Sequence, residues 1–303
     1  MMNTIDVNKS LFKISLAEWS LHNSIESGKI NHLDFPTIAK KQFGIDAVEY
    51  VNTLFRDMST DREYLMKLKM NADNEGVKNL LIMCDEEGSL SDIDPQKRRR
   101  AVENHFRWVD AAKFLGCHSI RINAHPIDFD PRTLGISEED MKKLAADGIR
   151  QLTEFAENVG INVLIENHGG LSSKSSWLTS VVREVNHPRF GTLPDFGNPN
   201  INENEIADSY ELVSALMPYA KGVSAKSETF EDEDKYIVGV DAFYFNGERV
   251  KVDYKKMIQI VLDANYSGYI GVEFQSSDDK YEIEGITKTT NILRRIRNEL
   301  TQK

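Results

Sequence analysis

The sequence of 303 residues predicts an α/β fold with the architecture of a closed (β/α)8 barrel, or TIM barrel, and three observations point to it. Short apolar runs alternate eight times with longer segments of helical pattern. Glycines such as Gly116 and Gly160 follow helical segments, where a left-handed C-cap favours glycine. Several apolar runs close on a polar or acidic residue, as the run 161–166 closes on Glu166. Eight such units over this length favour a closed barrel.

The expected strands are short and rich in apolar and β-branched residues. The run 161–166 has four apolar residues among its first five, which is typical of a strand buried on both faces. The eight expected strands cover residues 13–17, 45–50, 78–85, 119–125, 161–166, 190–198, 220–226 and 268–274.

The expected helices carry start and stop signals. In the segment 35–43, Pro36 stands near the start and Gly44 follows the end, as in many helices. The eight expected helices cover residues 35–43, 61–75, 98–115, 138–159, 176–185, 209–217, 253–264 and 283–300.

The alternative fold is an open, doubly wound sheet. That fold would need a glycine-rich phosphate loop after an early strand, and the sequence has none. No linker or low-complexity segment divides the chain, so we expect one domain over residues 1–303, with the barrel at about 12–300. We interpret the acidic segment 228–234 as a solvated loop, with a lid or an edge strand as the alternative.

The net charge of −11 argues against a nucleic-acid partner, which usually selects a basic patch. The basic run 97–100 opens an expected helix and fits a solvated helix face. No apolar stretch approaches the roughly 18 residues of a membrane span, so we expect no membrane contact. Cys84 and Cys117 lie in apolar segments and suit buried free thiols in a reducing compartment. The N-terminus has no signal-peptide pattern, and we expect a cytoplasmic protein.

In a parallel barrel the C-terminal strand ends meet at one mouth, where the active site lies. Three carboxylates, Glu166, Asp195 and Glu273, stand at ends of the expected strands five, six and eight. Brought together, they would repel one another unless a cation or protons neutralise them. Oxygen ligands suit Mg²⁺ or Mn²⁺, and a nearby imidazole would widen the choice to Zn²⁺ or Co²⁺. No nucleotide cofactor is expected, because the phosphate loop is absent.

Such a centre supports proton removal from a carbon next to a carbonyl, with a carboxylate on either face of that carbon. Glu166 and Glu273 are the candidates for this pair. If no metal binds, Lys226 is the natural cation to offset the carboxylates and polarise a substrate oxygen.

Four segments resemble the sugar-phosphate isomerase/epimerase superfamily, the xylose-isomerase-like barrels, in their order along the chain: 164–167, 194–198, 223–226 and 268–274. This superfamily includes ketose 3-epimerases, inosose dehydratases, hydroxypyruvate isomerases and barrel-type repair endonucleases. The resemblance implies that Glu166, Asp195 and Glu273 bind one divalent metal and that the two glutamates exchange the proton. It also suggests a homo-oligomer.

The sequence departs from the family pattern at two positions. Ser224 stands where the family has a histidine ligand, and Asn198 stands where the epimerases often have another histidine. A hydroxyl is a poorer ligand than imidazole for Zn²⁺-like ions. Three alternatives follow. A hard metal ion binds with water, and Asn198 or His168 as a possible further ligand, in its coordination shell; the metal is weakly held; or no metal binds.

Other polar residues at the strand ends are candidates for substrate binding, each beside a purely structural interpretation: Trp19, His22, Arg121, Asn123, His125, His168 and Asn198. Arg121 is equally well explained by an ion pair with Glu49 or Asp85, and the role of Glu49 is left open. His32, His105, His118 and His187 are given no role.

The leading hypothesis is a carbohydrate isomerase or epimerase that acts on a sugar or keto-sugar. A dehydratase or lyase on a keto-sugar or inosose shares the first step, and a non-catalytic sugar-binding barrel subunit is kept as an alternative because of Ser224. A repair endonuclease would need more histidine ligands and a basic surface. The acidic segment 275–279 favours an unphosphorylated sugar.

Overall fold

A computed structural model describes residues 11–125, 135–202, 205–240 and 249–302 of the chain. Eight parallel strands curl into the predicted barrel, in the order β6-β5-β4-β3-β2-β1-β13-β9. They are β1 Lys13–Ala17, β2 Ala47–Val51, β3 Lys78–Met83, β4 Ser119–Ile122, β5 Asn162–Glu166, β6 Phe190–Leu193, β9 Val223–Ser227 and β13 Tyr269–Phe274.

Two isolated parallel bridges, Thr192–Ala220 and Asp195–Ser224, join β6 to the β9 end of the sheet and close the barrel. The predicted sixth strand, 190–198, is too long, because β6 ends at Leu193. Pro194 follows it and has no N–H for the sheet. The chain beyond Pro194 therefore stays beside β9 only through the bridge at Asp195.

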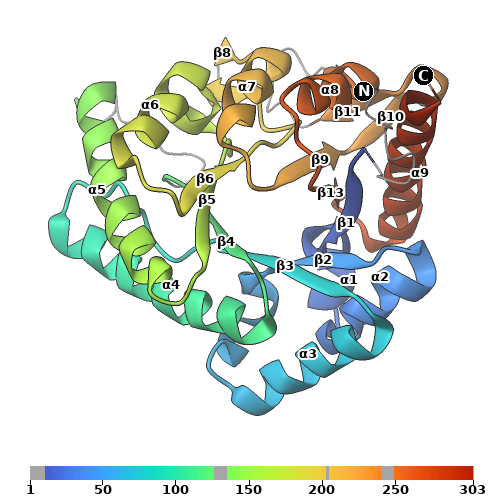
Figure 1. Ribbon diagram of the computed structural model, residues 1–303, viewed down its shortest axis with the longest axis horizontal. Helices are drawn as coiled ribbons and strands as arrows, with labels where there is room; N and C mark the ends of the chain where they lie inside the picture. The colour runs from blue at the N-terminus through green and yellow to red at the C-terminus, as the bar shows by residue number, and fades with distance from the viewer. Residues whose placement is uncertain (1–10, 126–134, 203–204, 241–248, 303) are drawn as a thin grey trace, which may run out of the picture.

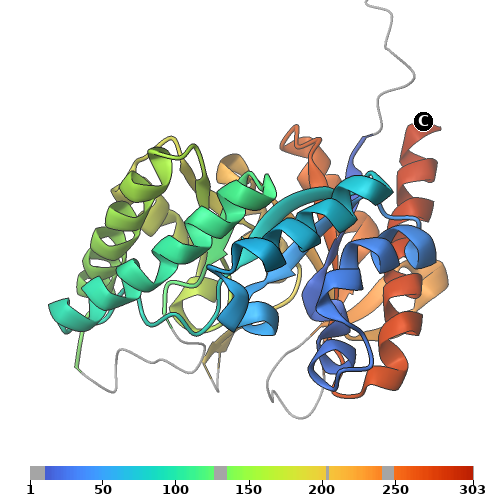
Figure 2. The ribbon, with the colours of Figure 1, turned by 90° about the horizontal axis from the view of Figure 1, so that it is seen from below.

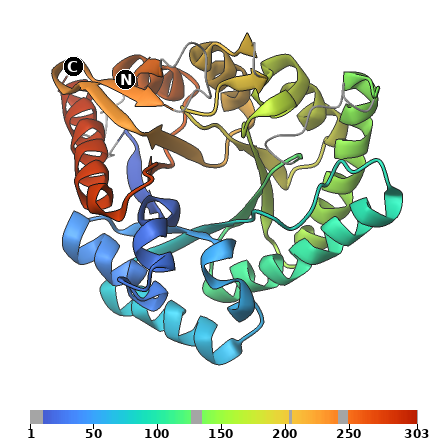
Figure 3. The ribbon, with the colours of Figure 1, turned by 180° about the vertical axis from the view of Figure 1, so that it is seen from behind.

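Helices form an outer ring around the strands, and Figure 1 and Figure 3 show this ring from its two ends. Seen from the side in Figure 2, the helices of the first half lie next to one another along the outside of the strands. The α-helices of the described chain are α1 His22–Glu26, α2 Phe35–Phe43, α3 Arg62–Glu75, α4 Pro95–Leu115, α5 Glu138–Glu157, α6 Ser175–Val185, α7 Ser209–Leu216, α8 Tyr254–Asp263 and α9 Glu282–Thr301. None of them is long and apolar enough to cross a membrane.

Most of the helix ends named in the sequence analysis follow the predicted chemistry, but α5 ends at Glu157 with Asn158 as its C-cap, so Gly160 does not cap it as expected. Gly44, Gly76 and Gly116 cap α2, α3 and α4 in the left-handed conformation, as the sequence predicts. The helix predicted at 98–115 begins three residues earlier, because Asp94 accepts hydrogen bonds from the first free N–H groups and Pro95 fits the first turn. Within the basic run 97–100, the side chains are exposed except for the partly buried Arg98.

The acidic segment 228–234 is not the loop that we expected. Its first part is strand β10, Thr229–Asp232, which pairs with β11, Ile237–Val240, and β12, Val250–Asp253, in a three-stranded antiparallel sheet. A second small sheet joins β7, Asn200–Asn202, to β8, Glu205–Ile206. The segment is thus the edge of a small sheet inserted between β9 and α8.

Strand periodicity divides the barrel side chains between two cores. One large core lies between the strands and the outer helices. A small apolar cluster belongs to the side chains that point into the lumen: Ala17, Val51, Leu81, Met83, Leu164 and Leu193. Polar side chains take other lumen positions, and those near the C-terminal strand ends form the site described next. Cys84 and Cys117 are buried free thiols, as predicted.

Candidate functional site

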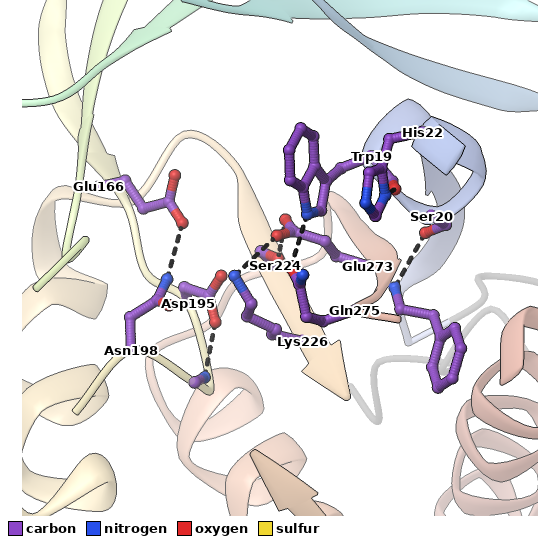
Figure 4. A network of polar contacts seen from close by, with 12 residues as sticks. Trp19, Ser20, His22, Glu166, Asp195, Asn198, Ser224, Lys226, Glu273 and Gln275 are labelled. Carbon is purple, nitrogen blue, oxygen red and sulfur yellow. Dashed lines mark hydrogen bonds and ion pairs between the residues drawn. The ribbon is translucent and has the colours of Figure 1, made fainter. Parts of the chain in front are cut away.

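Three carboxylates from three strand ends meet at the mouth of the barrel (Figure 4). Glu166 is the last residue of β5, Asp195 follows β6, and Glu273 lies in β13. One oxygen of each lies within 4.8 Å of one oxygen of the other two, and all three side chains are buried. The predicted convergence of these residues is therefore present.

The main chain of Asp195 is held by the side chain of Asn167, the residue after Glu166. Asn167 Nδ2 donates to the Asp195 carbonyl at 3.0 Å, and the Asp195 N–H donates to Asn167 Oδ1 at 2.8 Å. The N–H of Gly197 donates to Asp195 Oδ1 at 2.6 Å. Asp195 Oδ2 is buried and accepts no hydrogen bond from the described residues. This oxygen is thus held in place without a donor among them, as a metal ligand would be.

Glu273 takes its partners from the neighbouring strand β9, where Ser224 pairs with Gly271 and Lys226 pairs with Glu273. Ser224 Oγ donates to Glu273 Oε2 at 3.0 Å, and Lys226 Nζ lies 3.2 Å from Glu273 Oε1. Ser224 stands at the position of the family's histidine. Its hydroxyl group donates a hydrogen bond to a carboxylate of the group.

Glu166 contacts two polar side chains. Arg121 Nε, from β4, lies 2.8 Å from Glu166 Oε2, and Asn198 Nδ2 donates to Glu166 Oε1 at 3.3 Å. Asn198 has a φ of +57°, in the left-handed region that Asn tolerates better than most residues. In this conformation its side-chain amide reaches Glu166 at the end of β5.

Arg121 resolves one question that the sequence left open. Its Nη1 lies 2.6 Å from Asp85 Oδ1, so its ion pairs are with Asp85 and Glu166 rather than with Glu49. Asn123 Nδ2 donates to the same Asp85 oxygen at 2.7 Å. Glu49 lies in the lumen, where Ser15 Oγ donates to it at 2.6 Å.

The charges of the group are strongly shifted by burial and by one another. Burial, together with the charges of Asp195 and Glu273, raises the pKa of Glu166 well above its usual range, although Arg121 opposes the change. Burial and Glu273 raise the pKa of Asp195 to about 6. Burial would also raise the pKa of Glu273, but Lys226 and Arg121 bring it below its ordinary value. When ionised, the three carboxylates carry more negative charge than the two cations, Arg121 and Lys226, can balance.

These features fit a divalent cation. Among the described residues, Glu166, Asp195 and Glu273 form the one cluster of acidic, histidine or cysteine side chains close enough to hold a metal. The available ligands are carboxylate oxygens, and an added positive charge would relieve their repulsion. An all-oxygen set suits Mg²⁺ or Mn²⁺ better than Zn²⁺ or Co²⁺.

A cavity of about 650 Å³ opens beside this group. It is lined by most of the residues predicted to bind substrate, together with Lys226 and Glu273: Trp19, Arg121, Asn123, His125, His168 and Asn198. Glu166 and Asp195 lie deeper, and only 1% and 0% of their surfaces are exposed. His22 stacks against Trp19 with the two ring centroids 4.1 Å apart and does not line the cavity.

Trp19 is fixed by Gln275, a lining residue that we did not predict. Trp19 Nε1 donates to Gln275 Oε1 at 2.6 Å. Thr53 and His105 also line the cavity, and His105 had been given no role. His105 lies inside a helix whose pattern gives no sign of a cavity, so the sequence offers no signal for it.

Comparisons with known proteins agree with this architecture. The family model described as "Xylose isomerase-like TIM barrel" matches residues 38–296. No curated protein matches the sequence. Solved structures that match share the fold at low sequence identity, and three of them are informative.

The first is a xylose isomerase-like TIM barrel protein from Mycobacterium smegmatis in complex with magnesium: 14% identity, coverage of 97% of this chain and 99% of that chain, TM-score 0.66. The second is a D-psicose 3-epimerase with D-tagatose from Clostridium cellulolyticum H10: 15% identity, coverage of 95% and 99%, TM-score 0.67. The third is a probable 3-DHS dehydratase from Bacillus anthracis: 17% identity, coverage of 93% and 99%, TM-score 0.65.

Proposed function

The chain belongs to the xylose isomerase-like TIM barrel family, and we propose that it is a sugar isomerase or epimerase that moves a proton at a carbon next to a carbonyl. One observation carries the proposal: three buried carboxylates lie within 4.8 Å of one another at the mouth of the barrel, beside a cavity lined by an aromatic ring and by polar side chains. Structures with a similar fold include an epimerase with D-tagatose and a protein in complex with magnesium, which supports a sugar substrate and a divalent metal.

Glu166, Asp195 and Glu273 are the residues that would hold a divalent metal, with Mg²⁺ or Mn²⁺ favoured by their oxygen ligands. When bound, such an ion polarises the carbonyl and hydroxyl oxygens of a keto-sugar and makes the neighbouring C–H more acidic. Asp195 offers an oxygen that accepts no hydrogen bond within the described part of the chain, and Asn167 fixes the backbone from which it projects.

The two glutamates lie on either side of Asp195 around the barrel: β5, with Glu166, adjoins β6, and β13, with Glu273, lies beyond β9 on the other side. We assign the first proton removal to Glu273, because it lines the cavity and its negative charge is supported by Lys226. Glu166 returns a proton to the other face of the same carbon. Between these two steps, Lys226 stabilises the negative charge that develops on the substrate oxygen.

The remaining cavity residues hold the sugar. Trp19 offers an aromatic face to the C–H side of a ring and is kept in place by its contacts with His22 and Gln275. Arg121, Asn123, His125, His168 and Asn198 supply the polar contacts that orient the hydroxyl groups. The protein therefore acts on a small sugar or keto-sugar; a cytoplasmic location and a homo-oligomeric state stay predictions.

The test is exchange of deuterium from solvent into a panel of ketoses, followed by mass spectrometry and NMR. The wild-type protein, loaded with Mg²⁺ or Mn²⁺, is expected to exchange one carbon-bound proton, and Glu166→Gln and Glu273→Gln are expected to lose this activity. A product lighter by one water would instead identify the dehydratase reaction. If no sugar shows exchange or a product, the catalytic proposal is wrong and a sugar-binding barrel is favoured instead.

A further inference from the structure

Lys226 is a buried lysine whose charge is held at one place in the site. Its Nζ lies 3.2 Å from Glu273 Oε1, and only 5% of the residue is exposed (Figure 4). A lysine ammonium sits on a long, flexible stem, which loses much rotational freedom when it is held in one conformation. Neighbouring residues must therefore hold the stem if the ammonium group is to stay beside Glu273.

Gly197 lies against this stem. A Cβ added at Gly197 would lie 3.0 Å from Lys226 Cδ and 3.2 Å from Lys226 Cβ. Both distances are shorter than the roughly 3.5–4.0 Å at which carbon atoms attract each other best. The same Cβ would lie 3.3 Å from Asp195 Oδ1. The stem of Lys226 thus takes the space that a side chain at position 197 would need.

The main chain around Gly197 is held by hydrogen bonds to the site. The Gly197 N–H donates to Asp195 Oδ1 at 2.6 Å, and the Gly197 carbonyl accepts from Asn167 Nδ2 at 3.3 Å. The N–H of Phe196 donates to the carbonyl of Ser224, in β9, at 3.0 Å. Because the loop after β6 is fixed in this way, it cannot move aside for a larger residue without disturbing Asp195.

Tyr254 holds the main chain of Lys226. Its hydroxyl group, at the start of α8, donates a hydrogen bond to the Lys226 carbonyl. The rings of Tyr254 and Phe196 meet edge to face with their centroids 5.5 Å apart, and both residues are fully buried. The residue that holds the main chain of Lys226 therefore also packs against the loop that contains Gly197.

We propose that Gly197 is a positioning residue for Lys226: because it has no side chain, the stem of Lys226 lies against the loop and the ammonium group stays beside Glu273. This inference rests on the proposed function for the role of Lys226 at the substrate oxygen. A side chain at position 197 pushes the stem off the loop and moves the ammonium group from its place.

The first test observes the ammonium group directly, by NMR of protein labelled with ¹⁵N at the lysine Nζ atoms. A buried, ion-paired ammonium group exchanges its protons slowly enough to give a signal, and Lys226→Met assigns that signal by its loss. Gly197→Ala is expected to shift the signal or to broaden it beyond detection. Gly222→Ala is the matched control, because its Cβ would crowd Leu193 and Leu164 instead, and it should leave the signal unchanged. An unchanged signal in Gly197→Ala overturns the inference.

A second test uses urea unfolding and needs no substrate. Gly197→Ala is combined with Lys226→Ala, which removes the stem, and with Lys226→Met, which keeps a stem of similar length without the charge. Gly197→Ala is expected to lower the urea midpoint in the wild-type and Lys226→Met backgrounds, and to lower it by less than about half as much in the Lys226→Ala background. Equal losses in all three backgrounds place the crowding elsewhere and overturn the inference.

Deuterium exchange into a ketose connects the position of Lys226 to the reaction and is read separately. In a wild-type protein that exchanges, Gly197→Ala should lower kcat about ten- to a hundredfold with little change in KM, because a misplacement of about 1 Å has effects of this size. Gly222→Ala should keep the wild-type kcat. A wild-type kcat in Gly197→Ala overturns the positioning role. No exchange in the wild type removes the proposed reaction, and the NMR and unfolding tests still decide whether Gly197 positions Lys226.

Discussion

Glu49 is a carboxyl group enclosed in the barrel, and its replacement by Gln gives a prediction that can be worked out from the structure. Its side chain is 3% exposed; one oxygen accepts a hydrogen bond from Ser15, and the other has no hydrogen-bond partner among the residues that the structure describes. A Cβ at Gly271 would lie 2.9 Å from both carboxylate oxygens, so the glycine leaves the space that Glu49 fills. Gln has nearly the same shape and imitates the protonated acid.

Burial raises the pKa of Glu49 from 4.5 to about 7. The folded protein therefore holds this proton at pH values where the unfolded chain has released it. The stability that the protonated group contributes is fully present below pH 4.5 and is lost as the pH rises to about 7. A difference of 2.5 pKa units, at about 1.4 kcal/mol for each unit, amounts to about 3 kcal/mol.

Glu49→Gln removes this titration, so its stability relative to the wild type should rise by about 3 kcal/mol between pH 4 and pH 8. Urea unfolding of both proteins at several pH values measures the difference, in which the titration of all other groups largely cancels. Glu154→Gln, at an exposed position of α5, is the control and should show no such trend. A difference that stays constant with pH, or a Gln variant that loses stability relative to the wild type toward pH 8, would refute the reasoning.

Two further predictions concern packing and positioning. Gly285→Ala should destabilise the protein by about 1–3 kcal/mol in urea unfolding, because the added Cβ would lie 2.3 Å from the ring of Phe274; stability equal to the wild type would contradict this packing. Asn167→Leu should weaken divalent-metal binding in calorimetry, because Asn167 fixes the main chain of Asp195. Asn52→Leu is the matched control and should weaken it less, because Asn52 makes the same two bonds to the main chain of Asp85, outside the group of three carboxylates. Equal effects of the two variants would show that Asn167 has no special role.

The barrel could be predicted from the sequence because each of its units repeats a local signal. Glycine caps and apolar strands mark the units, and strand ends in a parallel barrel meet at one mouth whatever the loops do. The approach of Glu166, Asp195 and Glu273 follows from that topology alone, and the structure brings these residues together.

Other features depend on contacts between distant segments, which periodicity does not encode. The pairing of β10, β11 and β12 turned an expected acidic loop into a sheet edge. Nothing in the sequence indicates that the amide of Asn167 fixes Asp195. His105 lies in a helix whose pattern predicts only an exposed face and a core-facing one. Arg121 had two plausible partners, and only the register of β3 against β4 brings it to Asp85.

The central claim is that the three carboxylates bind a divalent metal, and the metal content of purified protein tests it most directly. Wild-type protein and Asp195→Ala are purified without chelator, loaded in turn with Mg²⁺, Mn²⁺ and Zn²⁺, and analysed by plasma mass spectrometry, with Asp263→Ala on the surface helix α8 as the control. We expect about one ion per chain in the wild type and the control, with Mn²⁺ or Mg²⁺ preferred, and none in Asp195→Ala. A wild-type protein that takes up no ion under any of these conditions, or an Asp195→Ala variant that keeps it, would contradict the account.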